Sequence, residues 1–219
     1  MSAAAEDAED AADDDSLAAG DFADWITAMN GAIRGEHDAA VPCGPCTACC
    51  TSSQFIHVAP DETDTLARIS PALLFPAPGL PRGNVLMGYD QDGRCPMLVD
   101  STCTIYENRP RTCRTYDCRV FVAADVALDD ASDKPAIAGQ ARRWRFTYDA
   151  TGEVAQAAVR AAAAFVRSRR DELPATLIPV NSAQLAVAGI HLHQRFLAGE
   201  DPPSVADVSV ELSRLRGRA

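Results

Sequence analysis

Cys43-Gly-Pro-Cys46-Thr-Ala-Cys49-Cys50 places four thiols within eight consecutive residues. A Cys-x-x-Cys pair lets two sulfurs reach one metal ion across a tight turn, and Gly44 and Pro45 are residues that favour such a turn. This stretch predicts a thiolate metal site that holds zinc or an iron–sulfur cluster. It also predicts a fold organised around that site.

The chain contains eight cysteines, and the other four all lie between residues 95 and 118. This bunching indicates a shared task, so the predicted metal ligands are Cys43, Cys46, Cys49, Cys50, Cys95, Cys103, Cys113 and Cys118. Cys49 and Cys50 are adjacent, and neighbouring side chains diverge. Either they serve different ions, or one of them is a small apolar core thiol. The count permits two zinc ions, one iron–sulfur cluster with cysteines to spare, or two clusters.

Length and composition limit the class of protein. A chain of 219 residues suits one domain with tails. It has no run of about eighteen apolar residues, so we expect no membrane span. The first residues, Met1-Ser-Ala-Ala-Ala-Glu-Asp, lack the basic and apolar segments of a secretory signal, which favours a cytoplasmic protein. Thiols stay reduced in that compartment, so a disulfide framework is the minor alternative to metal binding.

Acidic residues are concentrated at the start of the chain. Residues 1–24 carry nine carboxylates and no basic side chain, and subtracting these from the net charge of −11 leaves −2 for the rest. The body is therefore close to neutral. It has no basic footprint for nucleic acid and no polybasic patch for a membrane surface. The expected partners are a metal ion and, as a further possibility, a protein.

We divide the chain into a disordered acidic tail (1–15), a cysteine-cluster metal-binding region with an N-terminal helix (16–122), and a C-terminal helical region of the same domain (123–219). Alanine and acid without an apolar period indicate the tail. The predicted fold class is α-rich α+β. A small antiparallel sheet and short helices surround the cysteines, and the C-terminal helices pack on them.

Local patterns predict the elements around the cysteines. Ser16 is a candidate N-cap of a helix whose apolar residues recur at helical spacing up to Ile33. Residues 54–58 alternate like a strand, 59–70 favour a helix, and 71–83 hold four prolines and two glycines, which indicates an irregular loop.

A turn signal and a proline define the elements that follow. Residues 84–89 and 95–99 flank Asp90-Gln-Asp-Gly93, so a hairpin is expected there. Pro110 begins a helix with Cys113 in its early turns, where the helix dipole stabilises a thiolate.

The C-terminal third is rich in alanine and helical in pattern. Helices are expected over about 151–173, 181–199 and 204–216, each with a Thr, Ser or Asn near its start. Apolar residues within 137–148 also recur at helical spacing. The alternation of Trp144-Arg-Phe-Thr-Tyr148 also permits a strand, and we favour the helix.

The full cysteine pattern is C-x2-C-x2-C-C, a gap of 44 residues, and then C-P-x6-C-x-I-Y-x2-R-P-x2-C-R-x3-C. A bacterial ferredoxin would have its fourth cysteine at the position of Ser53. The pattern resembles the CxxCxxCC cysteine-cluster family of zinc- or iron-chelating proteins over roughly residues 43–121. That family is in turn similar to the cluster region of flagellin lysine-N-methylases. The resemblance implies a bound metal and leaves open any reaction.

Arginines near the second cysteine group could balance the charge of bound thiolates. Residues 94–119 carry five arginines against three acids. We expect Arg109 and Arg114 to donate hydrogen bonds to metal-bound sulfurs, as residues around the first ligand layer often do. Arg111 is equally well a solvated side chain, and Arg119 is expected to be one.

The remaining candidates are weaker. His57 could be a ninth ligand, although a half-buried strand histidine is the better interpretation. His191 and His193 lie two apart on a helix and do not form a ligand pair. Tyr106 and Tyr116 are expected to pack in the core rather than to gate electrons or protons.

Three functions remain open at this stage. The first is a metal-binding protein with a possible use in redox chemistry or metal handling. The second is a structural zinc module whose helices bind a partner. The third is a protein-modifying enzyme related to the lysine methylases, although the sequence shows no recognisable methyl-donor site.

Overall fold

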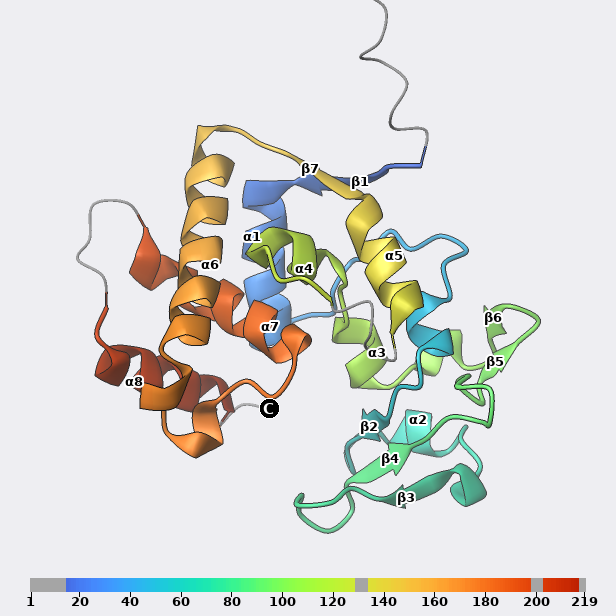
Figure 1. Cartoon of the computed structure of the whole chain (residues 1–219). Helices are drawn as coiled ribbons and strands as arrows, with labels where there is room; N and C mark the ends of the chain where they lie inside the picture. Colours follow the sequence, from blue (N-terminus) through green and yellow to red (C-terminus); the bar gives the residue numbers. More distant parts are fainter. Residues whose placement is uncertain (1–14, 129–133, 198–202, 217–219) are drawn as a thin grey trace, which may run out of the picture.

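The computed structural model describes residues 15–128, 134–197 and 203–216. Two neighbouring parts are evident (Figure 1). The helical part comprises the described residues 15–34 and those from 119 onward. The cysteine-bearing part comprises residues 43–118. Residues 1–14 of the predicted tail lie outside the described residues, and the division into 1–15, 16–122 and 123–219 stays a prediction.

The helical part is centred on α6 (Ala150–Ser168) and α7 (Ser182–Leu192), with α1 (Phe22–Ile33) and α4 (Arg119–Ala124) packed against them. Small residues bring the two central helices close together. A Cβ placed on Gly189 of α7 would lie 2.9 Å from the Ala163 Cβ and 3.0 Å from the Val159 carbonyl oxygen of α6. The alanine-rich sequence therefore sets the separation of these helices.

Short polar side chains fix where these helices begin. Asp21 accepts hydrogen bonds from the amides of Ala23 and Asp24, and Asp149 and Asn181 cap α6 and α7 in the same way. The prediction that Ser16 caps the first helix is wrong. Residues Leu17–Asp21 form strand β1 instead, and the helix starts one turn later than the polar signal suggested.

Strand β7 (Trp144–Thr147) pairs in parallel with β1 and directly follows helix α5 (Pro135–Arg143). The favoured helix over residues 137–148 is therefore wrong beyond Arg143, and the strand alternative is correct for residues 144–147. The physical reason is burial with period two: Trp144 and Phe146 are buried, whereas Arg145 and Thr147 are exposed.

Helix α8 (Val205–Arg216) closes the far side of the helical part. Its Val208 and Leu212 join a second apolar cluster with residues of α6 and α7. Ser204 and Asp207 exchange hydrogen bonds at its start, which confirms the predicted beginning of this helix. Short 3₁₀ turns complete the connections at Arg170–Glu172, Ala175–Leu177 and His193–Phe196.

The cysteine-bearing part contains a three-stranded antiparallel sheet in the order β2 (Ile56–Val58), β4 (Val85–Met87), β3 (Leu74–Pro76). The small antiparallel sheet is confirmed, but its pairing differs from the expected hairpin. Residues 85–87 pair with strands on both sides, and β3 lies inside the stretch expected to be a loop. Strand β4 pairs with β2 and β3, and not with residues 95–99 as the turn at residues 90–93 alone predicted.

Short elements fill the rest of this part. Strands β5 (Leu98–Val99) and β6 (Thr102–Cys103) form a separate two-stranded ribbon. Helix α2 (Thr63–Leu66) and helix α3 (Arg111–Thr115) are each about one turn long. Three 3₁₀ turns occupy Ala48–Thr51, Pro71–Leu73 and Tyr106–Asn108.

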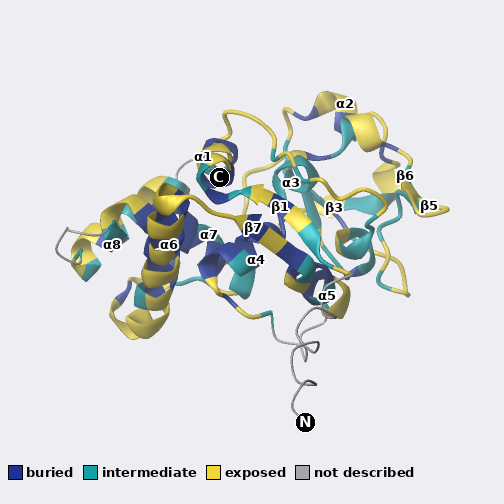
Figure 2. Ribbon diagram, turned by 90° about the horizontal axis from the view of Figure 1, so that it is seen from above, coloured by how far each residue is buried: buried dark blue, intermediate teal, exposed yellow. Residues whose placement is uncertain are grey.

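The apolar core lies mainly in the helical part. Figure 2 shows buried residues concentrated on α4, α6 and α7, whereas the region of α2, β5 and β6 is mostly half-buried or exposed. The cluster beneath the three-stranded sheet has only four buried members, which are Val58, Ile69, Met87 and Ile105. The fold class is α-rich α+β, as predicted. None of the described helices is both long and apolar enough to span a bilayer.

Candidate metal centre

The first cysteine group forms a compact turn followed by a 3₁₀ turn. The Cys46 amide donates to the Cys43 carbonyl at 3.0 Å, with Gly44 at φ +53° in the left-handed region that glycine tolerates. The Ala48 amide then points at the Cys46 sulfur, 3.5 Å away. The Gly-Pro spacer thus turns the chain back so that its backbone N–H groups face a sulfur.

Backbone hydrogen bonds bring the second cysteine group against the first. The Cys95 amide donates to the Cys50 carbonyl at 2.7 Å, and the Ser53 amide donates to the Gly93 carbonyl at 2.9 Å. The turn signal identified in the sequence makes this possible. Asp90 Oδ1 accepts the amides of Asp92 and Arg94, which reverses the chain just before Cys95.

Cys113 is positioned by helix α3, which is held in place by hydrogen bonds with Glu62 and with strand β2. Glu62 is buried and accepts the backbone amides of both Ala59 and Arg111. The Thr112 hydroxyl donates to the His57 carbonyl at 2.9 Å. The helix ends at Thr115, so Cys118 does not share it and instead immediately precedes α4 in the helical core.

The thiols fall into two electrostatic groups. In the first, burial together with Cys46 and Cys49 raises the pKa of Cys43 to about 11. Burial is also the main reason why the pKa of Cys118 rises to about 12, with Asp117, Cys43 and Cys46 adding to it. Cys43, Cys46 and Cys118 therefore lie within electrostatic reach of one another, although Cys118 is 72 or more residues from the other two in sequence.

The second group surrounds the other cysteines. Burial, with Cys49, Cys95 and Cys103, raises the pKa of Cys113 to about 12. Burial also raises the pKa of Cys95, and Cys103 and Cys49 contribute. These four thiols come from the first cysteine stretch, the segment before β5, strand β6 and helix α3.

The side chains of Cys49 and Cys50 are hydrogen-bonded to each other. A hydrogen bond from Cys50 lowers the pKa of Cys49 to about 7, whereas the same contact, burial and neighbouring thiols raise the pKa of Cys50. Cys49 acts on thiols of both groups, since it also raises the pKa values of Cys43 and Cys113. Cys50 is affected by Cys95 and Cys113. The adjacent pair thus lies where the two groups meet.

All eight cysteines are free thiols. Over residues 15–128, 134–197 and 203–216, no three Cys, His, Asp or Glu side chains already stand close enough together to hold a metal ion. The donors nonetheless fit zinc or iron in kind, because thiolates are the ligands that these metals take in structural and cluster sites. Binding would require the side chains to converge.

The predicted arginines differ in their surroundings. The Arg109 guanidinium stacks on the Tyr106 ring at 3.6 Å, and its charge lowers the pKa values of Cys49 and Cys113. Its Nε is buried and has no hydrogen-bond partner among the described residues. A buried N–H donor without a partner, close to thiols, is available to donate a hydrogen bond to a metal-bound thiolate.

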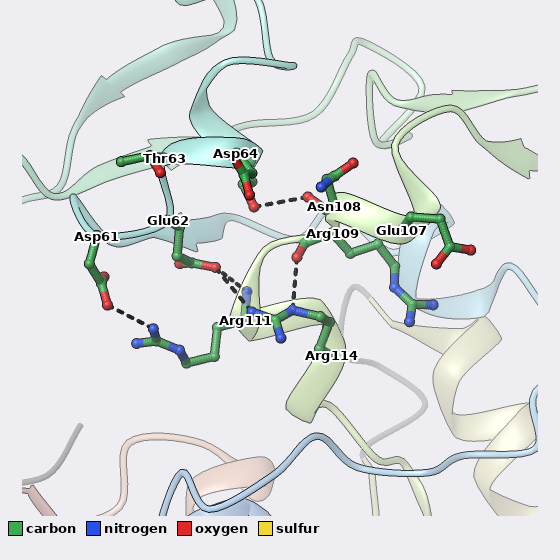
Figure 3. A pocket seen from close by; sticks show the side chains of 10 residues that line it. Asp61, Glu62, Thr63, Asp64, Glu107, Asn108, Arg109, Arg111 and Arg114 are labelled. Carbon is green, nitrogen blue, oxygen red and sulfur yellow. Dashed lines mark hydrogen bonds and ion pairs between the residues drawn. The ribbon is translucent and has the colours of Figure 1, made fainter.

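Arg114 is engaged with carboxylates and with the backbone of Arg109. It bonds Asp38 at 2.9 Å, lies 3.8 Å from Glu62, and its Nε donates to the Arg109 carbonyl at 3.0 Å. Arg111 pairs with Asp61 at the surface. A polar cavity of about 300 Å³ lies between these side chains (Figure 3). There the Arg111 guanidinium extends to Asp61, Arg114 turns toward Glu62, and the Arg109 guanidinium points away from both.

The expectation that Arg119 is a solvated side chain is wrong. Only 6% of its surface is exposed. Its guanidinium is bonded to Asp117 and to the carbonyls of Ala19 and Ala40. The physical reason is that α3 ends at Thr115 and a new helix starts at Arg119, which turns this side chain into the helical core.

Residues 42–134 match the model of the CxxCxxCC family, which is described as a "Putative zinc- or iron-chelating domain". The match contains all eight cysteines and the predicted arginines, and it ends before α5. No curated protein and no solved structure matches the chain.

Two contacts to the CxxCxxCC segment come from tryptophans outside it and were not predicted from the sequence. The Trp144 indole Nε1 donates to the Cys118 sulfur at 3.1 Å, and the Trp25 indole donates to Asp117 at 2.9 Å. The strand alternation of residues 144–148, which points Trp144 inward, was the available signal. Assigning that stretch to a helix concealed it.

The other candidates have ordinary structural partners. His57 Nε2 bonds Asn84 at 2.8 Å on the sheet, as the strand interpretation expected. His191 and His193 contact the backbone carbonyls of Glu211 and Ile190 and do not face one another as ligands. Tyr106 is 56% exposed, so its expected core position is wrong. Tyr116 packs against the helical core, as expected.

Proposed function

We propose that the eight cysteines of the CxxCxxCC segment bind zinc through two sets of thiolates. The observation that carries this proposal is the gathering of eight free thiols from separate segments into two groups, in which neighbouring thiols raise one another's pKa values. Soft thiolate donors favour zinc or iron over magnesium or calcium.

The two sets follow the two electrostatic groups. One set is Cys43, Cys46 and Cys118 with Cys49, because Cys49 is the member of the adjacent pair that acts on Cys43. The other set is Cys95, Cys103 and Cys113 with Cys50, whose carbonyl already accepts the Cys95 amide. Four thiolates per ion is the usual composition of a structural zinc site, and adjacent side chains that diverge suit two ions.

Charge balance supports roles for Arg109 and Arg114. Eight thiolates and two zinc ions leave a net charge of −4, which nearby cations must offset. The buried, unpartnered Nε of Arg109 is available to a metal-bound sulfur. Arg114 acts through Arg109, because its Nε donates to the Arg109 carbonyl and holds that residue in place.

An iron–sulfur cluster is the second candidate, and the position of Cys49 favours it. Because Cys49 influences thiols of both groups, one cluster near it could draw ligands from either. Such a centre would supply electron-transfer chemistry, with a redox use for the protein. Two zinc ions would instead supply stability, and the helical part would then present a surface to a protein partner.

Eight thiols without a disulfide suit a reducing compartment, so we place the protein in the cytoplasm. The experiment that separates the metals is anaerobic purification of the full chain followed by metal analysis and a visible spectrum. Two equivalents of zinc in a colourless protein support the first candidate. A brown protein with broad visible absorption and bound iron supports the second. A chain that carries neither metal and takes up neither overturns the proposal.

A further inference from the structure

Trp144 is the first residue of β7 and lies in the middle of the helical core, with 1% of its surface exposed. Its indole Nε1 donates a hydrogen bond to the Cys118 sulfur at 3.1 Å. Cys118 is itself buried, so water does not compete for this contact. The bond joins the helical part to a cysteine of the CxxCxxCC segment, although Trp144 lies ten residues beyond the end of that segment.

We propose that Trp144 is a positioning residue of the metal centre, which holds the Cys118 sulfur and donates its indole N–H to that sulfur when a metal is bound. The inference rests on the proposed function, and it adds that the helical part completes the centre.

The chemistry of the indole supports this role. An indole N–H is a donor only, so a buried tryptophan needs an acceptor. Among the described contacts, sulfur is the acceptor that Trp144 has. A metal-bound thiolate carries negative charge and accepts hydrogen bonds more strongly than a neutral thiol. The contact is therefore stronger with metal bound, and metal binding is stronger with the contact present.

The backbone around Trp144 makes the contact rigid. Strand β7 is paired in parallel with β1, with Leu17 opposite Trp144, and the Arg119 guanidinium lies 5.9 Å from the Trp144 ring. A donor fixed in this way restricts the movement of the sulfur. Residues that hydrogen-bond to metal ligands typically raise metal affinity by orienting those ligands.

Trp25 provides a matched control within the same core. It is also buried, its ring also lies 5.9 Å from the Arg119 guanidinium, and its indole also donates a hydrogen bond. Its acceptor, however, is a carboxylate oxygen of Asp117, 2.9 Å away, and not a sulfur. Replacing either tryptophan with phenylalanine removes one indole N–H from the same cluster, and only Trp144→Phe removes an N–H···S bond.

The test is a Co²⁺ titration of the full chain under anaerobic conditions, followed through the thiolate-to-cobalt charge-transfer absorption. We expect Trp144→Phe to raise the Co²⁺ dissociation constant about 10–100-fold and to shift the charge-transfer band at full occupancy. Trp25→Phe is expected to change neither by more than about threefold. Equal losses for the two variants, or a Trp144→Phe variant like wild type, would overturn the proposal.

A second measurement on the wild-type chain does not depend on the variant folding. The two indole N–H signals are followed by ¹H–¹⁵N NMR during Zn²⁺ addition, after assignment with Trp25→Phe. The Trp144 signal should move by much more than the Trp25 signal, because its acceptor becomes metal-bound. If Zn²⁺ binds and the Trp144 signal stays in place, the positioning role is wrong. If neither Co²⁺ nor Zn²⁺ binds wild type, the proposed function itself fails.

Discussion

The helical part and the cysteine-bearing part are held together by different forces. In the helical part, α1, α4, α6 and α7 bury one large apolar cluster, and α6, α7 and α8 bury a second. In the cysteine-bearing part, only four residues form a buried apolar cluster, and the chain runs through strands of two or three residues. Large apolar side chains such as Phe55, Leu80 and Val99 remain about half exposed there.

The two parts therefore obtain their stability from different sources. Apolar burial contributes roughly 25 cal/mol per Å², so the helical part can fold on its own burial. The cysteine-bearing part instead contains many turns, hydrogen bonds between its loops, and eight thiols. Small modules of this kind commonly depend on a bound metal. We therefore expect the two parts to respond differently to metal removal and to substitution.

The largest expected effect is that of removing the metal. Structural zinc contributes on the order of 10–16 kcal/mol in small modules, more than most domains have in total. A chelator should therefore unfold or partly unfold residues 43–118. The substitution Cys46→Ser should have the same effect in the absence of chelator. Limited proteolysis should find new cleavage sites in that range. With chelator present, Cys46→Ser and wild type should be cleaved alike, since both lack the metal.

The next effect concerns the buried Asp117–Arg119 ion pair, in which the two side chains are 1% and 8% exposed. Arg119→Leu leaves the Asp117 carboxylate buried without its cation. Such a loss typically costs about 3–5 kcal/mol in free energy of unfolding, which urea denaturation measures. Arg111→Leu is the control, because its ion pair with Asp61 is about half exposed and should contribute about 0–1 kcal/mol. Equal losses would mean that the buried pair is not needed.

A smaller effect on free energy is expected at Arg109. Replacing it with leucine removes the cation whose buried Nε lacks a partner, and metal affinity should fall about 10–100-fold. Arg114→Leu should weaken binding less, since Arg114 acts through the Arg109 backbone. Competition with a chromophoric chelator measures the affinities, again with Arg111→Leu as the control. Wild-type affinity in the Arg109 and Arg114 variants would assign the Arg-Pro-x-x-Cys-Arg stretch to packing instead.

The smallest expected effect tests close packing in the helical part. Gly189→Ala places a methyl group 2.9 Å from the Ala163 Cβ, and overpacking of this kind costs about 1–3 kcal/mol. Gly139→Ala in α5 is the matched control, because nothing lies within 4 Å of its added Cβ. There the higher helix propensity of alanine should stabilise by about 0.5–1 kcal/mol. Thermal unfolding of the two variants should therefore shift in opposite directions.

Much of this organisation can be predicted from the sequence, and the failures have a common cause. The cysteine spacing located the segment that matches the family model, and apolar periodicity with polar caps located most of the described helices. Strand pairing was not predictable. Strands β3 and β4 are too short to show an alternating hydrophobic pattern, and their pairing depends on contacts with strands distant in sequence. Arg119 and Trp144 were misjudged because their environment is made by contacts distant in sequence.

The central claim is that a bound metal holds the cysteine-bearing part and that apolar burial holds the helical part. Its most direct test is hydrogen exchange of the zinc-loaded and the metal-free full chain, compared segment by segment. Metal removal should abolish protection between residues 43 and 118, while α6 and α7 keep theirs. Protection that is unchanged between 43 and 118, or lost equally in α6 and α7, would contradict it.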